Sequence, residues 1–190
     1  AAISKNAFPV LFEIAKSEMG YTNQSPAEYA TSIIAAAIKE DWQGPLYIQG
    51  DHFQINAKKF ATDPKGQIRE IGNLVEQALA AGFFNIDIDT STLVDLSKET
   101  LTEQQRINFE LGAHFTKYIR DREPQGVTVS VGGEIGEVGH KNSTVEELEA
   151  YMDGFHAALD KMGKVKGPSK ISVQTGTSHG GIPLPDGSVA

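Results

Sequence analysis

The sequence predicts an α/β fold in which parallel strands alternate with helices. Five short apolar runs have the length of buried strands, and the four longer segments between them carry apolar residues with a helical period of about 3.6. Successive strands are spaced by roughly 40 residues, which leaves room for one helix in each interval. This alternation implies parallel strands joined by right-handed crossovers.

The expected strands and helices follow one another in a regular order. The strands are the runs 9–14 (PVLFEI), 46–49 (LYIQ), 84–89 (FNIDID), 127–131 (VTVSV) and 171–174 (ISVQ). The helices are expected over about 25–40, 68–79, 100–119 and 143–159. Capping-box patterns mark the starts of three helices: Ser25 with Glu28, Thr100 with Glu103, and Ser143 with Glu146.

Two architectures accommodate this order: an open doubly wound sheet and a (β/α)8 barrel. No Gly-x-Gly-x-x-Gly follows the first strand, so a dinucleotide-binding fold lacks its usual signal. A barrel usually needs ~250 residues, and five strands cannot close one. The chain also starts without Met and stops just after a loop, at Ala190. We therefore expect residues 1–190 to be one domain truncated at both ends.

The composition is that of a folded protein without a general affinity for polyanions. Apolar residues make up 39% and charged residues 22%, and the net charge of −8 comes without any basic cluster, which argues against nucleic-acid binding. The chain has no Cys, which excludes disulfides, thiolate nucleophiles and Cys-based zinc sites. No apolar run reaches the ~18 residues of a membrane span, and no signal peptide is visible. We expect a cytoplasmic protein without a membrane partner.

Polar and ionisable residues gather at the carboxyl ends of the expected strands. In parallel α/β proteins, sites form at this edge because the following loops and helix N-termini converge there. The alternative, that strand ends are merely solvated, is weakened because all five strands end in this way. The residues concerned are Glu13, Lys16, Ser17, Glu18, Asp51, His52, Asp87, Asp89, Ser91, Glu134, Glu137, Thr175, Thr177, Ser178 and His179.

Asp51 and His52 form the most informative pair. Imidazole is a good zinc ligand, and an adjacent carboxylate can act as an acid or a base. His179 lies in a Gly-rich segment (TGTSHGG) that suits phosphate binding, although an ordinary turn is the alternative. Lys16 fits a Schiff-base nucleophile or, as we prefer, a phosphate contact or a solvated side chain. The other histidines are expected to be packing or surface residues: His114, His140 and His156.

Several segments together resemble class II, metal-dependent ketose-bisphosphate aldolases. LYIQGDHFQ resembles that family's strand ending in Asp-His, and NIDIDTSTL resembles its next strand, with an Asp-x-Ser pattern at Asp89 and Ser91. GGEIGEVG is similar to its Glu-hydrophobic-Gly strand end, and SVQTGTSHGGIPLP to its Gly-Thr-x-His-Gly segment. Order and spacing agree over most of the chain. The resemblance implies a (β/α)8 TIM barrel, present here as an incomplete piece that corresponds to about strands 2 to 6.

The resemblance also implies a role for each matching residue. Asp51 is expected to be the catalytic proton donor at the cleaved alkoxide. The cofactor is expected to be Zn²⁺, with a monovalent cation as an optional addition. The implied metal ligands are His52, His179 and Glu134. The implied contacts to the substrate and its phosphates are Ser17, Asp89, Ser91 and Gly180.

Two departures from the family pattern bear on the chemistry. The family's third zinc-binding His and its second phosphate-binding segment lie on later strands, which this sequence lacks, so we expect the chain as given to bind zinc weakly unless a third ligand is supplied. Many members also have a mobile Glu in the loop after Glu134. Asn142 occupies that position here, and Glu137 or His140 is expected to substitute, with Glu137 taken as the second catalytic residue.

The implied activity is aldol cleavage or condensation of a ketose bisphosphate, such as fructose 1,6-bisphosphate, to dihydroxyacetone phosphate and an aldehyde phosphate. The expected partners are therefore a phosphorylated sugar substrate and further copies of the chain in a homo-oligomer. Two alternatives stay open. One is a catalytically silent aldolase-like barrel that supports another aldolase subunit, which Asn142 favours. The other is a different metal-dependent barrel enzyme such as a hydrolase.

Overall fold

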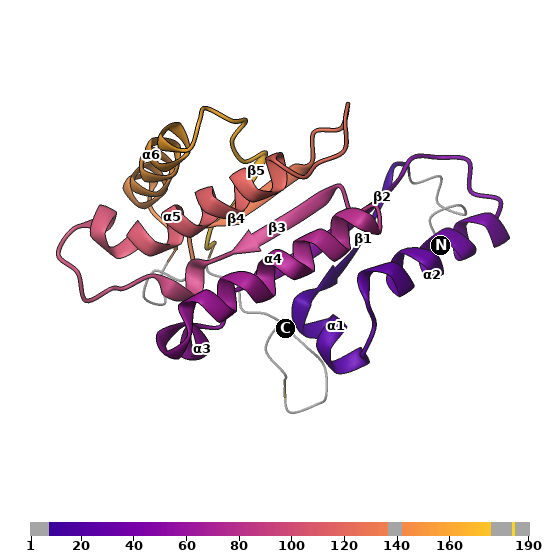
Figure 1. Ribbon diagram of the computed structural model, residues 1–190, viewed down its shortest axis with the longest axis horizontal. Coiled ribbons are helices and arrows are strands. Elements are labelled where there is room, and N and C mark those ends of the chain that lie inside the picture. The colour runs from indigo at the N-terminus through magenta and orange to yellow at the C-terminus, as the bar shows by residue number, and fades with distance from the viewer. Residues whose placement is uncertain (1–7, 137–141, 176–183, 185–190) are drawn as a thin grey trace.

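The computed structural model describes residues 8–136, 142–175 and 184, and it arranges five strands in one parallel sheet (Figure 1). The strands are β1 (Val10–Ala15), β2 (Leu46–Gln54), β3 (Asn85–Asp89), β4 (Ser130–Glu134) and β5 (Lys170–Ser172). They lie in the order β1-β2-β3-β4-β5, and every neighbouring pair is parallel. The predicted α/β class is confirmed. Within the described residues, the strand order shows no reversal of the kind that marks a doubly wound sheet.

Helices occupy each interval between the strands. They are α1 (Lys16–Thr22), α2 (Pro26–Lys39), α3 (Ala57–Thr62), α4 (Pro64–Ala80), α5 (Leu101–Arg120) and α6 (Val145–Lys161), with a short 3-10 turn η2 (Ser91–Leu93) after β3. α1 and α3 are too short to show a helical period, so the sequence did not predict them. No helix in the described part of the chain is both long enough and apolar enough to cross a membrane.

The helix starts follow the predicted caps with one correction. The capping boxes at Ser25 and Thr100 are confirmed. The fourth predicted helix is capped by Thr144 and not by Ser143: the Thr144 hydroxyl accepts the N–H of Glu147, and the Glu147 carboxylate accepts the N–H of Thr144 at 2.7 Å. Ser143 is engaged elsewhere, because its hydroxyl accepts the N–H of Gln174 at 2.8 Å.

The strand bounds differ most from the prediction in β4 and β2. β4 begins at Ser130 and not at Val127, because the preceding backbone is bonded outside the sheet. The N–H of Val127 donates to Pro124 and that of Val129 donates to the Glu123 carboxylate. β2 continues past its predicted end at Gln49 as far as Gln54. The extension places Asp51 and His52 inside the strand, where the sequence predicted the end of the strand.

The sheet has one apolar face and one polar face. The apolar side chains of β2 and β3 share a core with α4 and α5, which run along β3 in Figure 1. α6 packs on the same face, where Tyr151 lies against Gly133 of β4. Because side chains alternate along a strand, Asp87 and Asp89 point to the opposite face. The main contributors to the core are Phe53, Ile86 and Ile88 from the strands and Ile71, Val75, Phe115 and Ile119 from the helices.

A β-bulge in β2 decides which of its residues reach the polar face. Gly50 and Phe53 pair with two residues of β3 that are separated by Asp87 alone, so Asp51 and His52 together face that one residue. His52 takes a positive φ of 42°, a conformation that is uncommon for residues other than glycine. The extra residue lets Asp51 and His52 line the same cavity while Phe53 remains in the core.

Phe53 should therefore be important for stability. Its side chain is 0% exposed, and Phe53→Ala is expected to lower the free energy of unfolding by about 3–5 kcal/mol because it leaves a cavity beside the bulge. Phe84→Ala is the matched control, since Phe84 is 38% exposed and its loss is expected to cost about 1 kcal/mol or less. Urea denaturation followed by circular dichroism measures both. Equal losses would show that β2 is not anchored through Phe53.

Candidate metal centre

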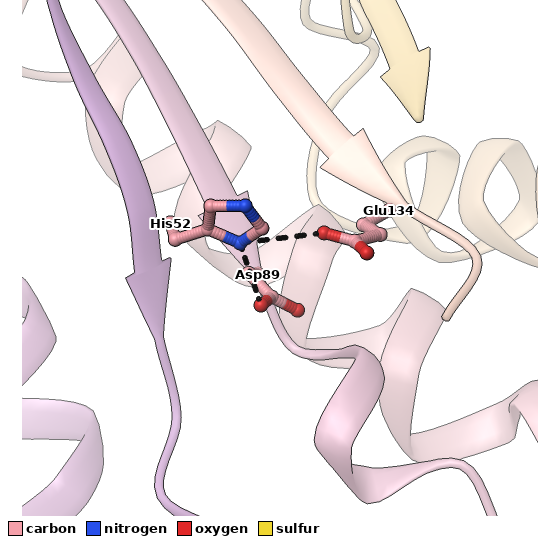
Figure 2. Close-up of side chains that lie close together, drawn as sticks. All are labelled: His52, Asp89 and Glu134. Atoms are coloured by element: carbon pink, nitrogen blue, oxygen red, sulfur yellow. Dashed lines mark hydrogen bonds and ion pairs between the residues drawn. The ribbon is translucent and has the colours of Figure 1, made fainter. Parts of the chain in front are cut away.

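Three side chains of the type that binds metals meet at the carboxyl edge of the sheet. Figure 2 shows the imidazole of His52 from β2 turned toward both Asp89 from β3 and Glu134 from β4. Nδ1 of His52 lies 3.2 Å from Oδ2 of Asp89 and 3.6 Å from Oε2 of Glu134. The candidate ligand atoms of the three residues all lie within 4.8 Å of one another. The strand ends thus bring His52 and Glu134 together as the sequence indicated, while their roles as ligands stay predictions.

The carboxylates of this cluster favour bound positive charge. The hydrogen bond to Asp89 raises the pKa of His52 to about 9 against the effect of burial, and the carboxylates of Asp51 and Glu134 act in the same direction. Burial, together with the charge of Asp89, raises the pKa of Glu134 to about 7. At neutral pH the imidazole of His52 is thus protonated, and the carboxyl group of Glu134 is protonated in about half of the molecules. A divalent cation would replace both protons, so the donor set fits a metal ion.

Asp89 is the most firmly held member of the cluster. It is 2% exposed, and its Oδ1 accepts hydrogen bonds from the hydroxyl and the N–H of Ser91 at 2.6 and 3.0 Å. Its Oδ2 accepts from the side-chain amide of Gln54 at 2.5 Å. Burial opposes ionisation, but the hydrogen bonds from His52, Ser91 and Gln54 outweigh it and lower the pKa of Asp89. An ionised carboxylate repels phosphate but can bind a metal ion, so this geometry adds a ligand role to the substrate contact that the resemblance implied for Asp89.

The cluster lies between two cavities. His52, Asp89 and Glu134 line both an inner cavity of about 290 Å³, on the polar face of the sheet, and an outer cavity of about 830 Å³, toward the loops that follow the strands. Asp51 lines the inner cavity, and its Oδ2 lies 3.8 Å from Nε2 of His52. Ser91 lines the outer one. A ligand that binds at the cluster therefore has room on both sides of it.

The other predicted site residues are placed apart from this cluster or are not described. Ser17 is exposed in the first turn of α1 and is not among the residues that line either cavity. His114 is half-buried on α5 and His156 is exposed on α6, in line with packing or surface roles. Four further predicted residues lie outside the described part of the chain: Glu137, His140, His179 and Gly180.

Sequence reasoning missed three polar residues of the site: Gln49, Gln54 and Lys170. Gln49 and Gln54 flank the bulge of β2, and nothing in the sequence marks a bulge at Asp51-His52. Lys170 had a usable signal, because Lys170, Ser172 and Gln174 alternate with Ile171 and Val173. That period of two is typical of a strand with one polar face, and it would have placed Lys170 on the same face as Ser172.

The raised pKa of His52 predicts a pH dependence for the metal-free protein. The folded state holds the imidazole proton up to about pH 9, whereas the unfolded chain releases it near 6.5, so the stabilisation is complete below about pH 6.5 and is lost as the pH rises through about 9. Because 37% of the side chain is exposed, screening by solvent reduces the contribution to about 1 kcal/mol. Urea denaturation at about pH 6 and about pH 9.5 should show this loss, and His52→Gln should remove it. A wild-type profile equal to that of His52→Gln would contradict the ion network.

Comparisons with known proteins give the fold and no more. No protein-family model matches the sequence, and no curated protein matches it. The structure is similar to that of a probable tagatose 6 phosphate kinase from Sinorhizobium meliloti 1021, with a TM-score of 0.64 and 17% sequence identity. The match covers 94% of this chain and 46% of that one, so this chain spans less than half the length of that structure.

Proposed function

We propose that the chain is part of a metal-dependent enzyme that breaks or forms a carbon–carbon bond in a phosphorylated ketose, and that its sheet is part of a (β/α)8 barrel. The observation that carries this proposal is the meeting of His52, Asp89 and Glu134 at the carboxyl edge of a parallel sheet, where barrel enzymes build their active sites. The structural neighbour is named for a tagatose phosphate, which supports a sugar phosphate as the substrate. The aldolase-like segments support aldol chemistry.

The donor set suits a catalytic zinc ion. Such sites usually have three protein ligands and keep one position open, and zinc accepts His, Asp and Glu as ligands; His52, Asp89 and Glu134 supply one imidazole and two carboxylates. When bound, Zn²⁺ supplies Lewis-acid polarisation of a substrate carbonyl. His179 stays a further ligand by prediction.

The chain's own residues have distinct tasks in this proposal. Ser91 and Gln54 fix Asp89, so its carboxylate stays beside Nδ1 of His52 and both groups would be in place to hold the metal ion. Asp51 lies beside the other imidazole nitrogen and faces the inner cavity, so its carboxylate can take and return the proton of the substrate hydroxyl whose neighbouring C–C bond breaks. Glu137 stays the predicted residue for the second proton transfer.

One observation favours a second candidate, a catalytically silent aldolase-like subunit. His52 already forms ion pairs with Asp51, Asp89 and Glu134. The protonated imidazole therefore compensates part of the carboxylate charge when no metal is bound. A silent subunit would retain this network as a structural feature. Its distinguishing property is the absence of stoichiometric zinc.

An activity assay tests the proposal. The protein is stripped with a chelator, reloaded with Zn²⁺, and incubated with fructose 1,6-bisphosphate or tagatose 1,6-bisphosphate, and triose phosphate is measured by coupled oxidation of NADH. We expect product from at least one substrate with zinc present and none after chelation. Stoichiometric zinc without product from either substrate would overturn the aldolase proposal, and absence of zinc as well would favour the silent subunit.

A further inference from the structure

A row of polar side chains crosses the face of the sheet next to the metal centre. Gln49 of β2 donates hydrogen bonds from its amide to Oε2 of Glu13 on β1 at 3.1 Å and to Oδ2 of Asp87 on β3 at 2.9 Å. Lys170 of β5 donates to Oε1 of Gln49, and its Nζ lies 2.9 Å from Oδ1 of Asp87. Four strands thus contribute to one row, which the metal centre does not use.

Gly132 of β4 makes the contact between Asp87 and Lys170 feasible. In the sheet register Gly132 lies opposite Asp87 on one side and Lys170 on the other. A Cβ at Gly132 would lie 2.0 Å from Oδ1 of Asp87 and 3.1 Å from Cε of Lys170. Any side chain there would fill the space in which the two charged groups meet. Because Gly132 has no side chain, Asp87 and Lys170 contact each other across β4.

The pair faces the inner cavity and keeps bonding capacity toward it. Asp87 and Lys170 both line that cavity, with side chains 27% and 38% exposed. Oδ1 of Asp87 is a buried atom paired with Nζ of Lys170 at 2.9 Å, so the exposed part of the side chain does not include it. Oδ2 accepts one hydrogen bond from Gln49, and a carboxylate oxygen can accept a second. Lys170 is also the one lysine or arginine among the described residues that line the inner cavity. An acceptor and a charged donor thus lie side by side on the wall of a space next to the metal centre.

We propose that Asp87 and Lys170 bind neighbouring oxygens of the substrate's hydroxyl-bearing carbon chain, which makes the inner cavity a polyol subsite. A hydroxyl group both donates and accepts, so it can donate to Asp87 while an adjacent oxygen accepts from Lys170. A phosphate group fits poorly, because the carboxylates of Asp51 and Asp87 would repel it. The inference rests on the proposed function for its sugar-phosphate substrate.

Two small phosphate esters test the subsite. Glycerol 3-phosphate and propyl phosphate share a three-carbon chain and a phosphate, but the second lacks the hydroxyls. Their affinities for the zinc-loaded protein are measured by calorimetric titration. The wild type should bind glycerol 3-phosphate about tenfold or more tightly than propyl phosphate, because a site built for hydroxyl groups rejects an analogue without them. Lys170→Met and Asp87→Asn should each reduce the ratio to about one to three, with the affinity for propyl phosphate unchanged.

The controls separate this inference from the proposed function. Lys98→Met removes an exposed lysine that pairs with Asp95, and it should keep the wild-type ratio. Asp87→Asn retains the shape of the side chain, so it serves where Lys170→Met does not fold by circular dichroism. An unchanged ratio in the folded variants, or no wild-type preference for glycerol 3-phosphate, overturns the subsite. Zinc titration of the same samples tests the metal centre separately. A protein that binds no zinc but still prefers glycerol 3-phosphate over propyl phosphate would count against the proposed function and not against the subsite.

Discussion

Replacement of His52 by alanine is expected to weaken zinc binding by about a hundredfold or more, since even the loss of a residue that only supports a ligand typically costs 10- to 100-fold. His52 is the one imidazole in the cluster of the described residues, and its Nδ1 faces both Asp89 and Glu134. Without it, the two carboxylates lose the nitrogen donor that distinguishes a zinc site from a site for a hard cation.

Competition against a chromogenic chelator measures this change. His156→Ala is the matched control, because it removes an exposed imidazole from α6. Its zinc affinity should equal that of the wild type. Equal affinities for His52→Ala and the wild type would show that zinc binds elsewhere, and the ligand assignment would have to be abandoned.

Asp51→Asn is expected to retain zinc and to lower kcat for ketose bisphosphate cleavage by about 100- to 10,000-fold. The amide has nearly the shape of the carboxylate, but it cannot take up a proton at neutral pH. Asp51 lies 3.8 Å from Nε2 of His52, whereas Asp89 and Glu134 face Nδ1, so the substitution leaves the three candidate ligands in place.

Zinc content and kcat have to be measured on the same preparation of Asp51→Asn. Asp121→Asn provides a control for the loss of a carboxylate, because Asp121 pairs with Lys117 at the exposed end of α5. It should retain full activity. Loss of activity in step with loss of zinc would make Asp51 a metal ligand and not a proton carrier, while full activity in Asp51→Asn would exclude both roles.

The sequence predicted the edge of the sheet at which the site lies, because polar residues after apolar runs mark the ends of parallel strands. It did not predict how the site is arranged. The bulge in β2 depends on how Gly50 and Phe53 pair with β3. This pairing cannot be deduced from the residues of either strand alone. The sequence predicted Asp89 as a contact to the substrate or its phosphates, and it gave no sign that this carboxylate is buried and bonded by Gln54 and Ser91.

The pair of Asp87 and Lys170 shows the same limit more strongly. The two residues are far apart in the sequence and lie on strands that are not neighbours, and they meet only because Gly132 on the intervening strand has no side chain. A glycine within a predicted strand has several explanations, which include a bulge and the close approach of another group. The register of three strands is needed to choose among them.

The central claim is that His52, Asp89 and Glu134 share one metal ion. Crystals of the zinc-loaded protein, measured on either side of the zinc absorption edge, test it most directly. We expect one anomalous peak between the three side chains, within about 2.0–2.2 Å of the imidazole nitrogen and of a carboxylate oxygen. A peak elsewhere on the protein, or none at saturating zinc with the His52–Asp89 contact intact, would contradict it.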